Sequence, residues 1–219
     1  MTFSLRWLLF AVLLLPISIV AQTTGVDTVA SARRDLFDGK YDAALATLDG
    51  AEKRGLTSGK LTELRGYIFL EQGKFDDAIK AFEAAKAQDK LTYNRLHIGD
   101  VLARQGKWEE ARAAYQTGLK ETDILTTNER LRFGVFIADL GLKDEEQARQ
   151  ALDAIMFPTE SATYYYAQAA WAFAHGSKRE GDDWVKRARD LFAGKSTDWF
   201  ERHLYDFGWL KSKPVPISE

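Results

Sequence analysis

The chain has 219 residues, of which 46% are hydrophobic, enough for one to one-and-a-half ordinary domains with a continuous core. Its 30 Lys and Arg against 32 Asp and Glu give a formal net charge of −2. This balance argues against both a basic nucleic-acid-binding surface and an acidic disordered tail. The absence of cysteine excludes disulfides, thiolate metal sites, a cysteine nucleophile and a lipidated N-terminal cysteine.

Residues 1–21 have the layout of a signal peptide. A short polar lead with Arg6 precedes the apolar run Trp7–Leu15, and Ile19–Ala21 resembles a small-residue cleavage site. A helix over Trp7–Ala21 would be about 22 Å long, shorter than a hydrocarbon core of about 30 Å. We therefore expect cleavage after residue 21 and export, with the periplasm as the expected compartment. The alternative is an uncleaved inner-membrane anchor that leaves the rest of the chain facing the periplasm.

A repeated segment runs through the remaining chain. Three stretches share a glycine, a lysine, an aromatic residue, an acidic residue and an alanine in the same order: Gly39–Ala44, Gly73–Ala78 and Gly106–Ala111. Weaker copies follow at Gly141 and Gly176, so that successive glycines are 33 to 35 residues apart. Seven residues before each glycine stands an alanine or a glycine: Ala32, Gly66, Gly99, Gly134 and Ala169. A period of this length is typical of stacked helix pairs.

Each part of the repeated segment has a physical role in a helix–turn–helix unit. Glycine ends the first helix because it adopts the left-handed conformation without a Cβ penalty. The aromatic residue two positions later can fill the gap between helix pairs, and the acidic residues then lie in the first turn of the second helix, where the dipole favours them. Small residues on facing helices, such as Gly66 opposite Ala78 and Gly99 opposite Ala111, would let the helix axes approach closely.

At these residues the chain resembles the tetratricopeptide repeat family, over roughly residues 25–192. The resemblance implies an all-α fold: a right-handed superhelical solenoid of about five helix–turn–helix repeats. The fourth unit carries two extra residues in its turn, the fifth lacks the turn aromatic, and the family's tryptophan in the first helix is missing throughout. An unrelated helical bundle is the alternative. We expect a signal peptide at 1–21, the repeat domain at 22–195, a C-terminal capping helix at 196–211 and a disordered tail at 212–219.

The segment Thr197–Lys211 differs from the repeats, because five of its fifteen residues are aromatic. Helical spacing places Phe200, Leu204 and Phe207 on one face. We expect this helix to cover the exposed hydrophobic end of the stack, as solenoids require. The alternative is a docking helix for another protein or for a second copy of the chain.

Catalytic patterns are missing from the sequence. His97, His175 and His203 are isolated, without a second histidine at metal-ligand spacing. The stretch Gly194–Ser196 resembles the end of a phosphate loop, but Arg189 stands where the first glycine of that loop is needed. We therefore predict no enzyme activity, no cofactor and no metal.

The resemblance implies that the concave side of the solenoid, lined mainly by first helices, is the binding surface for a peptide. Glu63, Asp100 and Asp139 lie where capture of a peptide carboxylate would need positive charge, so this mode is not predicted. Tyrosines would serve as anchors with a large contact area and a small entropy cost. Counting from the closing glycines places these residues on the concave side: Lys60, Glu63, Tyr67, Glu71, Tyr93, Leu96, Asp100, Arg104, Asn128, Leu131, Asp139, Tyr166 and Phe173.

The sequence thus predicts a non-enzymatic scaffold or adaptor in the cell envelope that binds a segment of another protein in this groove. The alternative is a structural subunit of an envelope complex or homo-oligomer, assembled through the C-terminal aromatic helix. The expected partner is a protein or peptide. Nucleic acid and small-molecule substrates are not expected, and the membrane is expected only through the N-terminal segment if it stays uncleaved.

Overall fold

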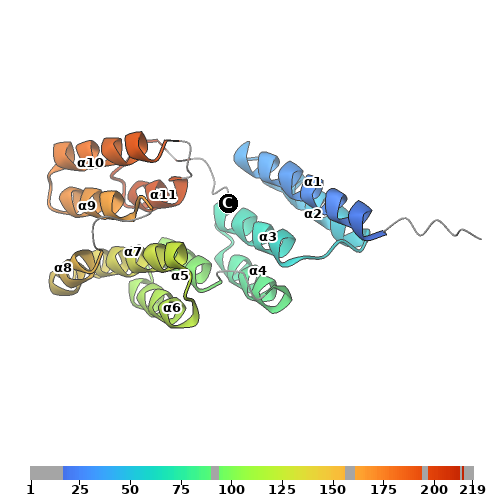
Figure 1. Cartoon of the computed structure of the whole chain (residues 1–219), viewed down its shortest axis with the longest axis horizontal. Coiled ribbons are helices and arrows are strands. Elements are labelled where there is room, and N and C mark those ends of the chain that lie inside the picture. Colours follow the sequence, from blue (N-terminus) through green and yellow to red (C-terminus); the bar gives the residue numbers. More distant parts are fainter. Residues whose placement is uncertain (1–16, 90–93, 156–160, 194–196, 213, 215–219) are drawn as a thin grey trace, which may run out of the picture.

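The computed structural model describes residues 17–89, 94–155, 161–193, 197–212 and 214, and these residues form helices without any strand. Residues 1–16 of the expected signal peptide and most of the expected tail lie outside the described residues. The helices follow one another in antiparallel pairs (Figure 1). Their bounds are α1 (Ile17–Phe37), α2 (Tyr41–Lys53), α3 (Gly59–Glu71), α4 (Phe75–Gln88), α5 (Asn94–Arg104), α6 (Trp108–Glu121), α7 (Leu125–Leu142), α8 (Glu145–Asp153), α9 (Thr163–Ala174), α10 (Lys178–Leu191) and α11 (Asp198–Asp206).

The turns inside the pairs lie at the predicted glycines in four of five cases. Gly39, Gly73, Gly106 and Gly176 have φ angles of 71°, 72°, 72° and 77°, the left-handed conformation expected at the end of a first helix. The prediction is wrong for the fourth pair. There α7 continues through Gly141, and Lys143, with a φ of 59°, ends the helix instead.

Gly141 has a packing role in place of the predicted turn role. A Cβ atom added to Gly141 would lie 2.3 Å from Cδ2 of the Trp108 ring. The glycine therefore makes room for the turn aromatic of the preceding pair. The two extra residues move the end of the helix to Lys143, and no glycine stands there.

The glycines among the small residues of the first helices are covered by large rings of second helices. A Cβ atom added to Gly66 would lie 2.6 Å from Cε1 of Phe82, and one added to Gly99 would lie 2.3 Å from Cε1 of Tyr115. Phe82 and Tyr115 are themselves almost completely buried. Close packing within a pair thus depends on a ring lying against a glycine.

The buried side chains form two clusters along the array. The first joins α1, α2 and α3 and includes Leu36, Leu48 and Ile68. The second extends from Leu70 to Leu204 and includes α11, and Tyr67 packs against both clusters. In the part of the chain that the structure describes, no helix combines the length and the hydropathy needed to cross a membrane.

Candidate functional site

The last helix of the described residues, α11, contacts α3, α5, α7 and α9, the first helices of the second to fifth pairs, which we call the inner helices. Figure 1 shows α11 beside α9. Side chains of α11 reach at least one residue of each, among them Glu71 on α3, Asp100 on α5, Phe133 on α7 and Tyr166 on α9. The expected cap therefore extends along the inner side of the array, over residues predicted to bind a partner. We call this set of contacts the α11 seat.

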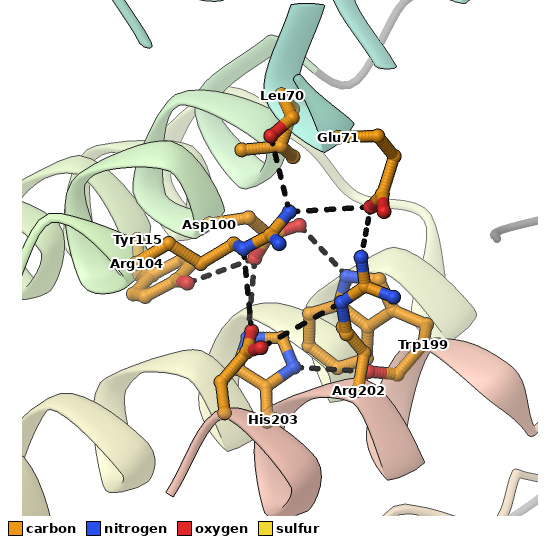
Figure 2. Close-up of polar contacts among 9 residues, drawn as sticks. Leu70, Glu71, Asp100, Arg104, Tyr115, Trp199, Arg202 and His203 are labelled. Atoms are coloured by element: carbon orange, nitrogen blue, oxygen red, sulfur yellow. Dashed lines mark hydrogen bonds and ion pairs between the residues drawn. The ribbon is translucent and has the colours of Figure 1, made fainter. Parts of the chain in front are cut away.

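Asp100 is the acceptor at the centre of the α11 seat. Its carboxylate, 7% exposed, accepts hydrogen bonds from Tyr115 Oη at 2.8 Å and Trp199 Nε1 at 2.8 Å, and Nε2 of His203 lies 3.4 Å from it (Figure 2). The other ring nitrogen of His203, Nδ1, lies 2.9 Å from the carbonyl oxygen of Trp199. Because both ring nitrogens face acceptors, the protonated imidazolium satisfies this site best.

The pKa of His203 reflects this position. Burial lowers the pKa, but the hydrogen bond to Asp100 and the charge of that carboxylate raise it, and the net shift is upward from the ordinary value of 6.5. The Trp199 carbonyl and Asp206 add to the rise. The positive charge of His203 is thus coupled to the docking of α11 on α5.

Glu71 forms a second polar contact at the end of α3. Its carboxylate accepts hydrogen bonds from Arg104 Nη1 at 3.2 Å and from Arg202 Nη2 in a close contact (Figure 2). The side chains of Glu71 and Arg202 are each 7% exposed. Arg104 also lies 3.5 Å from Asp206 Oδ2, so that two arginines and two carboxylates from three helices form one network.

Glu201 fixes the opposite side of α11. Its carboxylate accepts hydrogen bonds from Tyr166 Oη at 2.7 Å and from Arg189 Nε and Nη2 at 2.8 and 2.7 Å. Burial raises the pKa of Glu201, but the bonds from Arg189 and Tyr166 outweigh it and hold the pKa below its ordinary value. The ring of Tyr166 also stacks on Phe200, with 5.3 Å between the centroids.

Aromatic contacts continue beyond these polar ones. Phe133 of α7 meets Trp199 and Phe200 edge-on, at centroid distances of 5.6 and 5.2 Å. After α11 ends, Phe207 packs on Trp108 at 5.2 Å and Trp209 stacks on Phe173 at 5.8 Å. These aromatic residues of the C-terminal segment thus pack on the repeat helices of the same chain.

The residues predicted to bind a partner fall into three groups. Glu71, Asp100, Arg104 and Tyr166 contact α11, and Phe173 contacts the segment that follows it. Leu96 and Leu131 are core residues, each 1% exposed, and Asp139 is buried with Arg112 Nη1 at 3.1 Å.

The third group has no hydrogen bond, ion pair or ring contact with α11 among the contacts described above. Lys60 is exposed at the start of α3, and Asn128 on α7 is half-buried. Glu63 and Tyr67 are half-buried and both bind His97, with Glu63 Oε1 2.8 Å from Nε2 and Tyr67 Oη 3.0 Å from Nδ1. Tyr93 lies outside the described residues.

Sequence reasoning missed several residues of the inner side. His97 joins Glu63 to Tyr67, and Arg130 lies over the ring of Trp199 at 5.8 Å. The anchors Trp199 and Arg202 were assigned to a terminal cap. The sequence feature that could have identified them is the high aromatic content of Thr197–Lys211, because a solvent-exposed helix does not need five aromatic residues in fifteen. Across the described ranges, no three His, Asp or Glu side chains gather in a way that could hold a metal ion.

Comparison with family models supports the repeat interpretation in the N-terminal part of the chain. Residues 22–98 match the family model of a tetratricopeptide repeat-like domain. A solved structure of MamA from AMB-1 is similar at 16% identity, with 83% of this chain and 97% of that chain covered and a TM-score of 0.48. No curated protein matches the chain. The resemblance predicted from the repeats is thus confirmed at residues 22–98, which match a tetratricopeptide repeat-like domain within an array whose described elements are all helices.

Proposed function

We propose that this protein is a non-catalytic scaffold that binds a segment of another protein along the inner side of its helix array, in the cell envelope. Repeat-like domains of this type generally serve as protein-interaction modules, which supports the assignment as a non-catalytic scaffold. The observation that carries the proposal is the α11 seat. A helix from a distant part of the chain is already bound there, through contacts to all four inner helices.

The inner side has the chemistry of a binding surface for polypeptide. Acidic acceptors on α3 and α5 are followed by aromatic rings on α7 and α9, and tyrosine provides a large contact area at small entropy cost. The residues Lys60, Glu63 and Tyr67 would begin this surface at its N-terminal end. Envelope localisation rests on the signal-peptide layout of residues 1–21, and the family match begins at Gln22, directly after the expected cleavage site.

Assembly through the C-terminal aromatic helix is less well supported. Trp199, Phe200 and Leu204 are each no more than 2% exposed in the single chain, so the apolar face of α11 is already covered. Assembly through that face would require α11 to detach first from the repeat helices of the same chain.

Site-specific crosslinking tests the proposal. A photoreactive amino acid at Lys60, at the open end of the inner side, should give a crosslinked protein partner in the cells that produce this chain. The matched control is Lys80 on α4, whose side chain is 77% exposed on a second helix. Adducts of equal yield from both positions, or none from Lys60, would contradict binding on the inner side.

A further inference from the structure

The helix α11 depends on its seat for its structure. It has nine residues, and isolated helices of this length are marginal in water. It is also the last helix in the described part of the chain, following α10. Its departure would therefore leave every helix pair of the array intact.

The α11 seat and α11 have complementary chemistry. The seat offers two buried acceptors, Glu71 and Asp100, and α11 brings the donors Arg202 and Trp199 to them, with His203 beside Asp100. These charge-assisted bonds are stronger than neutral ones and specify a donor at each position.

The apolar contacts of the seat follow the same register. Phe133 and Tyr166 receive the adjacent rings of Trp199 and Phe200. The seat thus binds two adjacent aromatic residues, Trp199 and Phe200, and two adjacent basic residues, Arg202 and His203, on the same short helix. The basic pair begins three residues after the first aromatic residue.

The contacts of α11 differ from those that hold the repeats together. Within the repeats, rings lie against glycines and are almost completely buried, as Tyr115 does against Gly99. Around α11, many contacts join charged groups that water would solvate again if the helix left: Glu71, Asp100, Arg202 and Glu201. Release of α11 exposes Trp199, Phe200 and Leu204, but the renewed solvation of these charged groups offsets part of that cost, and no helix pair has to open.

From these observations we propose that α11 is a built-in, displaceable occupant of the inner side, and that the partner is an amphipathic helix of the same chemistry, with an aromatic pair followed by a basic pair. The proposal rests on the proposed function and adds its regulation, because α11 has to leave before the partner helix binds. In the closed chain the apparent affinity for that partner is reduced by the small fraction of open molecules.

A labelled synthetic peptide of residues Thr197–Lys211 serves as the probe, with binding followed by fluorescence anisotropy on the full-length chain. Arg202→Glu places a negative charge beside Glu71 and should release the chain's own α11. This variant should bind the peptide at least about tenfold more tightly than the unaltered chain, because the open fraction rises.

Two controls isolate the α11 seat. Arg187→Glu makes the same charge change on α10, where Arg187 is exposed and lies over Trp184, so its affinity should equal that of the unaltered chain. A peptide carrying the Arg202→Glu change should lose binding to the released chain. If Arg202→Glu does not keep its helical circular dichroism, Arg202→Gln removes the charge alone and should still gain about threefold.

Two results would overturn the inference. Equal affinity of the peptide for the unaltered, Arg202→Glu and Arg187→Glu chains would show that α11 does not block the inner side, while peptide binding itself, and the proposed function, would stand. Absence of binding to folded Arg202→Glu and Arg202→Gln chains would show that the seat does not accept a separate helix. The crosslink from Lys60 then decides the proposed function independently.

Discussion

At the scale of single residues, the array depends on glycines that receive aromatic rings. The ring of Tyr115 lies between two of them: added Cβ atoms would come within 2.3 Å of it at Gly99 and 2.7 Å at Gly134. The ring is completely buried, and its hydroxyl donates to Asp100, so it has little freedom to move aside. This arrangement couples the packing of two helix pairs to the acceptor that holds Trp199.

The substitution Gly99→Ala should therefore lower the free energy of unfolding by about 1–3 kcal/mol, the usual cost of overpacking. Urea unfolding followed by circular dichroism measures the change. Gly50→Ala is the matched control, because its Cβ would meet only the flexible end of Arg54, at 3.4 Å. In the interior of α2 that change should stabilise by about 0.5–1 kcal/mol. Equal effects of the two substitutions would contradict the role assigned to the ring of Tyr115.

At the scale of the element, the docking of α11 depends on the protonation of His203. The histidine faces Asp100 on α5 and Asp206 on its own helix, and its Nδ1 faces the Trp199 carbonyl. Its pKa is raised in the folded chain, so its contribution to stability is fully present below the ordinary value of 6.5. That contribution is lost as the pH rises through the raised pKa.

Thermal melts at pH 6 and pH 8 test this coupling. The unaltered chain should lose more stability between these pH values than His203→Gln, which has no proton to lose; for a chain of this size about 1 kcal/mol corresponds to about 2–4 °C. His175→Gln is the control, since His175 is exposed at the end of α9 and contacts Glu145 instead of α11. The same pH dependence in all three chains would exclude His203 as its source.

At the scale of the whole molecule, the sequence predicts what is local and misses what is distant. The turns at Gly39, Gly73, Gly106 and Gly176 were predictable because each needs a positive φ, which glycine adopts freely. The turn at Lys143 was not, since a lysine in the left-handed conformation carries no such signal.

In the candidate site, too, the sequence predicts the local features and misses the distant contacts. Helical spacing identified Glu71, Asp100 and Tyr166 as residues of one side of the array, and these three all contact α11. Spacing does not say which distant segment covers that side. Glu71 and Arg202 are 131 positions apart, and their contact depends on how the four helix pairs from α3 to α10 are arranged (Figure 1).

The contact between Glu71 and Arg202 joins α3, beside the N-terminal cluster, to the last helix in the described part of the chain. The substitution Glu71→Gln removes the charge that holds Arg202 and Arg104. If this costs 1–2 kcal/mol, amide hydrogen exchange in α11 should become about 5–30-fold faster, and the last turn of α3 should follow. Exchange in α8, which packs mainly on α7, should stay unchanged. Equal acceleration in α8 would indicate loss of overall stability, and unchanged exchange in α11 would show that other contacts hold the helix in place.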